Sequence, residues 1–404
     1  MAVGSGAIPE IFPVSGVRIG VAEAGIRKKN RKDLVLFELA ENTSVAAVFT
    51  KNAFCAAPVH VAKKHLAASA CRYWLINTGC ANAGTGEQGM LDAQRSCANL
   101  AKIAGVVAEN VLPFSTGVIG ELLPMEKLIA GLPLALSDLS VDHWLRAAEG
   151  IMTTDTRPKL ASRKIVLSGK TVAITGISKG AGMIKPNMAT MLGFVATDAQ
   201  VAQKDLQALL QIVADKSFNR ITIDGDTSTN DACMLAATGS SGVALTSASA
   251  EWNAFAAAIE SVFVELAQAI VRDGEGATKF ISVVINGGHD SDECLRAAYA
   301  IAESPLVKTA LFASDPNWGR ILAAIGRSGI AALDTSRINI FLNDVQIVAN
   351  GGRAPSYTEA QGVAAMAPEE IVIRVELQRG AASETVWTCD FSHDYVTINA
   401  EYRT

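Results

Sequence analysis

The sequence has 404 residues, with 35 lysines and arginines against 40 aspartates and glutamates, which gives a formal net charge of −5. Half of the residues are hydrophobic and 19% are charged, so a disordered, collagen-like or low-complexity chain is excluded. The mildly acidic balance argues against nucleic acid or an anionic membrane as the main partner.

The cysteines and the apolar runs indicate the compartment. Seven cysteines are scattered without a C-x-x-C pair, a pattern that favours reduced thiols over disulfides or a zinc site. Residues 1–12 carry no basic segment ahead of an apolar stretch, so no secretory signal is expected. No uncharged apolar run reaches the roughly 18 residues that span a bilayer. We therefore expect a soluble, cytoplasmic protein.

Strand-like and helix-like patterns alternate along the chain without a long linker or a repeat. The predicted strands cover, in chain order, residues 17–22, 34–39, 44–50, 72–77, 280–285, 337–342, 345–348, 371–377 and 384–391. Apolar residues at steps of three and four predict a long amphipathic helix over residues 250–272, and a shorter helix is expected at about 88–103. The basic run 27–32 is interpreted as a solvated turn. This mixture indicates α/β or α+β packing, with a weak candidate boundary at Gly287-Gly288.

Two glycine-rich segments imitate nucleotide-binding motifs. Residues 84–89 match G-x-G-x-x-G, but residues 78–83 separate them from the preceding strand, and no βαβ continuation is evident. The segment Ser168-Gly169-Lys170-Thr171 lacks the first glycine of a P-loop and predicts a hairpin turn instead. The five histidines show no metal-ligand spacing, and there is no G-x-S-x-G elbow. The sequence therefore indicates no cofactor and no metal.

Several polar clusters remain, each where a strand or loop meets a glycine. They cover residues 115–117, 153–156, 179–192, 224–231, 272–278 and 399–404. Each cluster alone is consistent with a loop, and without family knowledge Thr190 would be an ordinary half-buried residue. The combination of a glycine-flanked lysine, an asparagine and a small residue before a threonine argues for a functional site.

Together these stretches resemble the ornithine acetyltransferase family, the bifunctional glutamate N-acetyltransferase and amino-acid acetyltransferase of arginine biosynthesis. The resemblance runs from about Val17 to Thr404, and its departures, Ala181 and Lys185, touch no position with an implied function. Its most specific motifs are residues 179–192, 224–231, 315–320 and 399–404. It implies an αββα sandwich similar to the self-processing aminopeptidases, with a smaller C-terminal α+β domain.

The resemblance also implies that the chain cuts itself at the Ala189–Thr190 bond. The products would be an α chain of residues 1–189 and a β chain of residues 190–404, which assemble as α2β2. In structural terms we expect a larger sandwich domain over about 1–286 and a smaller domain over 287–404. After cleavage Thr190 would carry its own α-amine, whose ordinary pKa of about 7.7–8.0 suits a general base for the threonine hydroxyl. No catalytic histidine is then required.

In the implied ping-pong cycle, Thr190 takes the acetyl group of N-acetylornithine and passes it to glutamate. Thr116 and Gly117 would form the oxyanion hole. The implied substrate-binding residues are Thr153, Lys179, Thr190, Glu275, Asn399 and Thr404, with Thr154 as the alternative to Thr153. From their charges we assign Lys179 to a substrate carboxylate and Glu275 to a substrate ammonium. Asn187 and Asp231 are assigned to self-cleavage.

Two other functions stay open from the sequence. The same N-terminal threonine would serve a self-processing aminopeptidase or amide hydrolase that admits water, and an uncut chain would serve as a non-catalytic amino-acid sensor. Hydrolysis of acetylornithine that does not need glutamate would favour the hydrolase. The sequence also leaves open whether acetyl-CoA is a second acetyl donor.

Overall fold

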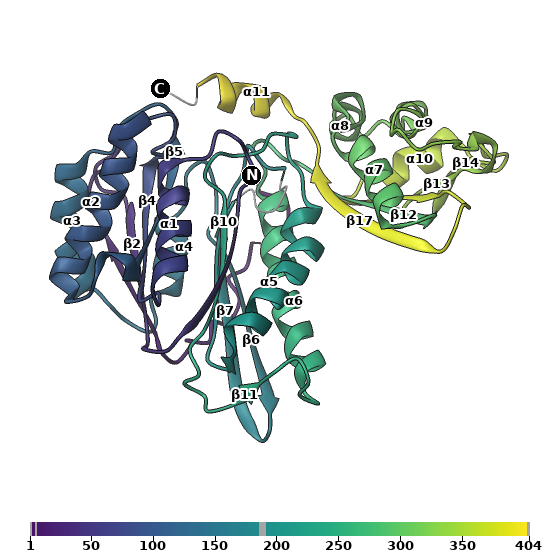
Figure 1. Ribbon diagram of the computed structural model, residues 1–404. Helices are drawn as coiled ribbons and strands as arrows, with labels where there is room; N and C mark the ends of the chain where they lie inside the picture. Colours follow the sequence, from purple (N-terminus) through teal and green to yellow (C-terminus); the bar gives the residue numbers. More distant parts are fainter. Residues whose placement is uncertain (1, 5, 186–190, 402–404) are drawn as a thin grey trace.

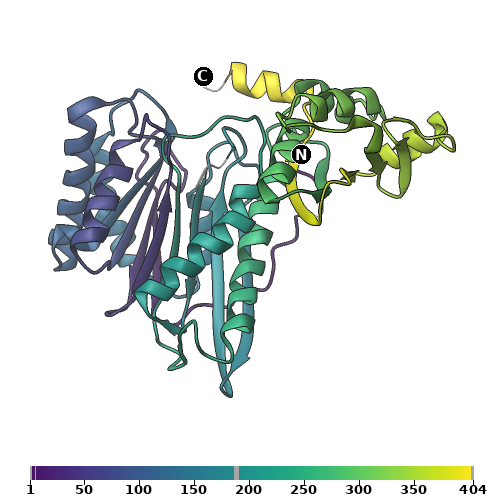
Figure 2. The same cartoon turned by 45° about the vertical axis from the view of Figure 1, so that its right-hand side comes forward.

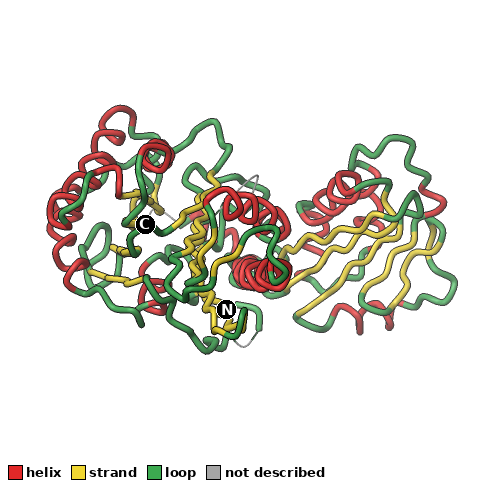
Figure 3. Tube along the Cα trace, turned by 60° about the horizontal axis from the view of Figure 1, so that its bottom comes forward, coloured by secondary structure: helices red, strands yellow, loops and turns green. Residues whose placement is uncertain are grey.

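The computed structural model of the chain describes residues 2–4, 6–185 and 191–401. Its main body is a sandwich of two β-sheets that pack face to face, with helices on both outer sides (Figure 1). A smaller body follows in the chain and lies beside the sandwich (Figures 1 and 3). The expected αββα sandwich with a smaller C-terminal α+β domain is therefore confirmed.

The first sheet has the strand order β1-β2-β4-β5. Its strands are β1 (Val17–Ala22), β2 (Leu34–Leu39), β4 (Tyr73–Cys80) and β5 (Val111–Val118). Its helices are α1 (Ala57–Ala68), α2 (Gly86–Ala104) and α3 (Met125–Ser137) on the outer face, and α4 (Trp144–Gly150) at the inner edge. A short 3₁₀ helix, η1 (Ala108–Asn110), precedes β5.

One expectation about this sheet is wrong. Strands β4 and β5 pair in parallel and α2 connects them, so the chain does contain a βαβ unit around the glycine-rich segment. The predicted strand stopped at residue 77, whereas β4 continues to Cys80. Gly79 hid this continuation, because glycine is depleted in strands.

The second sheet has the order β3-β10-β8-β7-β6. Its strands are β3 (Ser44–Phe49), β6 (Lys159–Leu167), β7 (Lys170–Lys179), β8 (Leu192–Thr197) and β10 (Ala232–Ala237). The helices α5 (Gln203–Lys216) and α6 (Trp252–Arg272) cover its outer face (Figure 2). The short strands β9 (Gln200–Val201) and β11 (Ala244–Leu245) pair with each other, and η2 (Phe218–Arg220) follows α5.

Two local predictions for this sheet are confirmed. Ser168 and Gly169 form the tight turn between β6 and β7, and their φ values of 49° and 73° suit a two-residue hairpin. Helix α6 is the predicted amphipathic helix, and by length and composition alone it could cross a membrane. Its apolar face is buried against β6 and β7, so it is a core helix of the sandwich.

Aromatic rings fill the space between the two sheets. Phe37 and Trp74 of the first sheet meet Phe194 of the second, with ring centroids 5.7 and 5.5 Å from that of Phe194. Trp144 of α4 packs against Phe37 at 5.6 Å. All four side chains are fully buried. Such pairs contribute packing energy beyond their buried area, and here they fix one sheet on the other.

The smaller body is built on a six-stranded sheet with the order β15-β14-β13-β16-β12-β17. Its strands are β12 (Phe280–Gly288), β13 (Asn339–Leu342), β14 (Val345–Ala349), β15 (Gly352–Arg353), β16 (Glu370–Glu376) and β17 (Ala382–Cys389). Its helices are α7 (Ser291–Ala302), α8 (Pro305–Phe312), α9 (Trp318–Gly326), η3 (Thr335–Arg337) and α10 (Glu359–Met366).

The two bodies have separate cores. Ile281 belongs to the separate core of the smaller body, while Phe280 belongs to the core of the sandwich. The chain therefore changes core at the start of β12, and Gly287-Gly288 lies at the far end of that strand. After β17, helix α11 (His393–Ala400) lies back over the end of the sandwich (Figures 1 and 2).

We predict that Phe194→Ala lowers the free energy of unfolding by about 3–5 kcal/mol, because it leaves a cavity between the sheets. Urea unfolding followed by tryptophan fluorescence measures this directly, since Trp74 and Trp144 lie in the same core. The exposed Val166→Ala on β6 is the control and should change the free energy by no more than about 0.5 kcal/mol. Equal effects of the two substitutions would contradict the inter-sheet core.

Candidate active site

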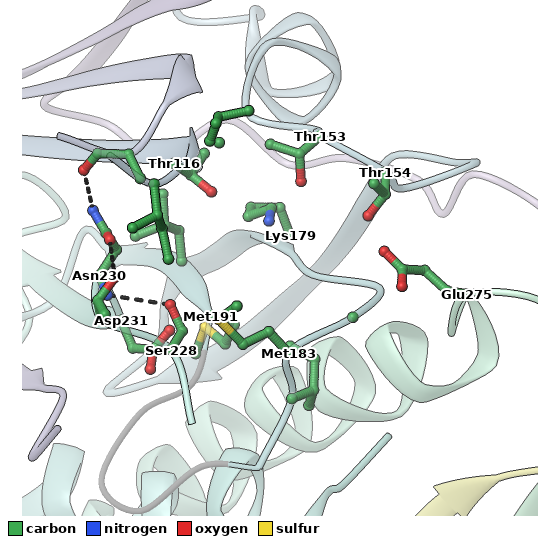
Figure 4. Close-up of a pocket in the computed structure, with 18 of the residues that line it drawn as sticks. Thr116, Thr153, Thr154, Lys179, Met183, Met191, Ser228, Asn230, Asp231 and Glu275 are labelled. Atoms are coloured by element: carbon green, nitrogen blue, oxygen red, sulfur yellow. Dashed lines mark hydrogen bonds between the residues drawn. The ribbon is translucent and has the colours of Figure 1, made fainter. Parts of the chain in front are cut away.

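A cavity of about 250 Å³ lies where the ends of both sheets meet α11 (Figure 4). Strand β5 contributes its last residues, β7 contributes Lys179, and β8 contributes its start. Loops before β10 and after α4 and α6 complete the wall. The lining residues are Ala81, Thr116, Gly117, Val118, Ile119, Thr153, Thr154, Lys179, Gly182, Met183, Ile184, Met191, Leu192, Ser228, Thr229, Asn230, Asp231, Glu275 and Asn399.

Most of the residues predicted from the sequence line this single cavity. They are Thr116, Gly117, Thr153, Lys179, Glu275 and Asn399. Thr154 lines it too, so the structure does not separate Thr153 from Thr154. Thr190, Ala189, Asn187 and Thr404 lie outside the described residues. Asp231, which the sequence assigned to self-cleavage, lines the cavity as well. The roles of all these residues stay predictions, but the residues that line the cavity come from six separate segments of the chain.

The Thr116-Gly117 pair sits at a break in the β4–β5 ladder. The register between the two strands shifts at Gly79 and Cys80. Gly117 has a φ of +134°, and a Cβ on it would come within 2.3 Å of the Gly79 carbonyl carbon. Only glycine fits this position, because any side chain would push the two strands apart. The irregularity turns the end of β5 toward the cavity.

Lys179 is the last residue of β7 and pairs with Leu192 of β8. Its ammonium projects into the middle of the cavity, near the hydroxyls of Thr153 and Thr154 and the Glu275 carboxylate (Figure 4). It makes no hydrogen bond or ion pair with the part of the chain that the structure describes. Burial lowers the pKa of Lys179, and the Asp155, Asp231 and Glu275 carboxylates partly oppose this shift. An unpaired cation in a polar cavity suits a carboxylate ligand.

A buried ion cluster supports the cavity from behind. The Lys159 ammonium lies 2.5 Å from Asp155 Oδ1 and 2.6 Å from Asp273 Oδ2, and all three side chains are almost completely buried. Burial alone would raise the pKa of Asp155, but the Lys159 and Lys179 ammonium groups outweigh it and hold the pKa well below its usual range. Asp155 is therefore a permanent anion inside the protein.

The same carboxylates fix the backbone around the cavity. Asp155 accepts hydrogen bonds from the amides of Thr153 at 2.9 Å and Gly180 at 2.7 Å. Asp273, the residue after α6, accepts from the Thr156 amide at 3.0 Å. The cluster thus ties together the loop after α4, the end of β7 and the end of α6.

The opposite wall joins the two sheets. The Asn230 side-chain amide donates to the carbonyl oxygens of Ala81 at 2.6 Å and Ser115 at 2.9 Å. Next to it, Asp231 is buried, and its Oδ2 atom has no hydrogen-bond partner among the described residues. Burial raises the pKa of Asp231 well above its ordinary value, and the Ser228 hydroxyl and Lys179 only partly offset this. A protonated Asp231 can donate a hydrogen bond as well as accept one.

Glu275 connects the cavity with the C-terminal helix. Its carboxylate accepts a hydrogen bond from the Asn399 side-chain amide at 2.8 Å, and its own amide donates to Ala181 O at 2.8 Å. A Cβ on Gly182 would come within 2.4 Å of Glu275 Oε2, so the Glu275 carboxylate lies directly against this glycine. Asp224 accepts from the Met183 and Ile184 amides and holds the same loop.

Asp155, Asn230 and Asp273 lie in polar clusters that the sequence singled out, but no role was assigned to them, and Lys159 was missed altogether. Asp155 is four positions from Lys159, but Asp273, which completes the ion cluster, is 114 positions away, so no sequence pattern indicated the cluster. No group of three or more His, Cys, Asp or Glu side chains that could hold a metal ion occurs within the described residues. The cavity is polar, with the Lys179 ammonium in its middle and the Glu275 carboxylate in its lining.

Comparison with known proteins gives the family. The ArgJ family model matches residues 18–404. The chain is 60% identical to the arginine biosynthesis bifunctional protein ArgJ of Pseudomonas syringae pv. tomato and 59% identical to that of Pseudomonas fluorescens, with 100% of both chains covered each time. A crystal structure of arginine biosynthesis bifunctional protein ArgJ from Bacillus halodurans is 37% identical, with a TM-score of 0.49, over 50% of this chain and 95% of that one. This chain belongs to the ArgJ family, and the resemblance seen in its motifs is confirmed.

We predict that Lys159→Met lowers the free energy of unfolding at pH 7 by about 3–5 kcal/mol, because it leaves two buried carboxylates without their cation. Denaturant unfolding measures the loss, and the exposed Lys204→Met on α5 is the matched control.

The pH dependence checks the cause of this loss. The folded-state pKa of Asp155 is depressed, so its stabilisation is present above the unfolded pKa of about 3.9 and is lost as the pH falls below it. The difference in the free energy of unfolding between wild type and Lys159→Met should therefore be largest near neutral pH. It should become smaller as the pH is lowered. A difference that does not change with pH would contradict the ion cluster.

Proposed function

We propose that the chain cuts itself at the Ala189–Thr190 bond and that Thr190 then carries acetyl groups from N-acetylornithine to glutamate in arginine biosynthesis. The observation that carries this proposal is the single cavity formed by Thr116, Gly117, Lys179 and Glu275 in a chain of the ArgJ family. Met191, the residue that follows Thr190 in the sequence, lines the same cavity.

The chemistry suits a threonine that supplies its own base. None of the five histidines, all of which the structure describes, lines the cavity. The α-amine freed by cleavage accepts the Oγ proton as Oγ attacks the acetyl carbonyl carbon, and then returns the proton to the leaving amine. The Thr116-Gly117 pair is the proposed donor set for the developing oxyanion.

The charges suit amino-acid substrates. N-acetylornithine and glutamate share an α-carboxylate, which Lys179 would bind, and Glu275 would bind the side-chain ammonium of ornithine. The acetyl ester on Thr190 must outlast ornithine release, so the cavity must keep water away until glutamate arrives. The cover that α11 provides over the end of the sandwich supports this requirement (Figure 1).

The proposal also covers the second acetyl donor, the assembly of the two chains and the cellular compartment. The relatives are named bifunctional, and we extend this to the chain as the use of acetyl-CoA as a second acetyl donor. The α chain (1–189) and β chain (190–404) would stay together and pair as α2β2. The protein would work in the cytoplasm without a metal or a bound cofactor.

We predict that Thr190→Ala gives one uncut chain without transfer activity, because both the freed amine and the hydroxyl are lost. Intact-mass measurement and an assay of ornithine release with and without glutamate give the two readouts. The exposed Thr171→Ala on β7 is the control and should be cut and active. Two fragments and normal turnover from Thr190→Ala would contradict the proposal, and glutamate-independent release by the wild type would favour a hydrolase.

We predict that Lys179→Met raises the KM for N-acetylornithine roughly tenfold or more, because a charge-assisted hydrogen bond to the carboxylate is lost. The variant must first be identified by mass as cut, so that only binding is compared. Lys170→Met, at the exposed start of the same strand, should leave the KM unchanged. An unchanged KM for N-acetylornithine in Lys179→Met would show that Lys179 does not bind the substrate carboxylate.

A further inference from the structure

A second cavity of about 160 Å³ adjoins the first. The two cavities share Gly117, Val118, Thr153 and Thr154, so they are contiguous along one wall. The second cavity is otherwise lined by Arg27, Lys28, Arg31, Asp33, Thr78, Gly79 and Ile398. Its outer part is thus formed by the basic run between β1 and β2, which the sequence alone suggested was a solvated turn.

The basic run places unpaired positive charge on this cavity. In a chain of net charge −5, five of the six residues 27–32 are lysine or arginine. Arg27 is paired with Glu121 at 2.8 Å, and Lys32 is paired with Glu149. Lys28 and Arg31 line the cavity and make no ion pair with any carboxylate that the structure describes.

The one acidic residue in this lining does not cancel the charge. Asp33 is buried, and its two oxygens accept hydrogen bonds from the amides of Ala24 at 2.7 Å and Ile26 at 2.6 Å. Its carboxylate is therefore occupied by the backbone of the turn. Burial also raises the pKa of Asp33, although those same amides oppose the shift. Positive charge dominates the cavity.

Arg31 is held rigidly. Its Nη2 atom donates to the carbonyl oxygens of Met152 at 2.7 Å and Thr153 at 3.2 Å. This leaves Nε and Nη1 without a partner in the described part of the chain. A guanidinium fixed on one side and open on the other is suited to a phosphate or carboxylate. Thr153 lines both cavities, so the hydrogen bond from Arg31 to the Thr153 carbonyl oxygen joins the second cavity to the wall of the first.

Two glycines, Gly79 and Gly117, form part of the lining of the second cavity. A Cβ on Gly79 would come within 2.8 Å of the Arg27 Cβ, and a Cβ on Gly117 would come within 2.3 Å of the Gly79 carbonyl carbon. Val118 and Ile398 add apolar surface beside these glycines. Neither glycine has space for a side chain, because the Cβ position is already occupied by the Arg27 side chain or by the backbone of β4.

We propose that this second cavity, lined by Lys28 and Arg31, binds the leaving group of an acetyl thioester whose thiol is attached by a slender arm to phosphate groups. The arm would lie along Gly79 and Gly117, with the thioester in the first cavity and the phosphates at the basic turn. The inference rests on the proposed function, since it uses Thr190 as the acetyl acceptor.

The reaction balances without a further reactant. Thr190 Oγ attacks the thioester carbonyl carbon, the C–O bond forms and the C–S bond breaks. The proton from Oγ passes through the α-amine to the leaving sulfur, which departs as a thiol. The glutamate amine then attacks the acetyl ester, forms the C–N bond and releases Oγ, which recovers a proton from that amine.

N-acetylornithine does not explain this charge. N-acetylornithine carries one carboxylate and one ammonium, so its net charge is zero, and Lys179 already provides a cation for the carboxylate. The side-chain carboxylate of glutamate is the competing occupant. The two ligands differ in the reaction that they affect, because glutamate is the acceptor for both acetyl donors.

The test compares Lys28→Glu with Lys29→Glu, its exposed neighbour that does not line the cavity. For each cleaved enzyme, KM is measured for acetyl-CoA with saturating glutamate, and for N-acetylornithine and glutamate in the exchange reaction. We expect Lys28→Glu to raise the KM for acetyl-CoA about tenfold or more and to weaken its dependence on salt. The KM values of the exchange reaction should stay unchanged. S-acetylpantetheine, which lacks phosphates, should be used equally by wild type and variant.

Three outcomes would overturn the inference. Equal KM values for acetyl-CoA in Lys28→Glu and Lys29→Glu would show that the second cavity does not bind the phosphates. An equal rise in the KM for glutamate with both donors would assign the cavity to the glutamate side chain. A wild-type enzyme that exchanges acetyl groups but never uses acetyl-CoA would overturn the inference while leaving the proposed acetyl exchange intact.

Discussion

The contact of the buried Lys159 ammonium with Asp155 and Asp273 is the constraint on which the site depends. Asp155 and Asp273 come from different loops, and each also holds backbone amides around the cavity. The cluster carries one more negative than positive charge, and this excess acts on the nearby Lys179 ammonium. The Asp155 carboxylate raises the pKa of Lys179 against the effect of burial. The charge that would bind a substrate carboxylate is thus sustained by a group that never touches the substrate.

The position of the proposed cut has a structural consequence. It lies between β7 and β8, which are neighbours in one sheet, and the strand order β3-β10-β8-β7-β6 mixes strands from before and after it. The two fragments would share the β7–β8 and β3–β10 ladders and the aromatic core between the sheets. They could not separate without unfolding the sandwich. Cleavage would therefore free a terminus next to Met191, which lines the cavity, without loosening the walls of the cavity.

The sequence predicted features whose cause is local and missed those whose cause is distant. Helix α6 follows from its apolar periodicity, and the β6–β7 turn follows from Ser168-Gly169. The motif residues at the cavity were found because they lie in short, distinctive segments. The Lys159 cluster offered no signal, since one partner, Asp155, is four positions away but the other, Asp273, is 114 positions away. Asn230 likewise joins two sheets through Ala81 and Ser115, and such pairings exist only once the chain has folded.

The two adjoining cavities give a physical reason for one nucleophile to accept acetyl groups from unlike donors. Lys179 and Glu275 carry the charges that an amino-acid donor presents, while Lys28 and Arg31 carry those that a phosphorylated donor presents. The cavities meet at Gly117 and Thr153, so each leaving group would approach Thr190 from its own side. The acetyl ester is the same in both cases, and glutamate would meet one intermediate whichever donor formed it. Donor choice can then change through the basic turn alone, without altering the residues that stabilise the reacting carbonyl.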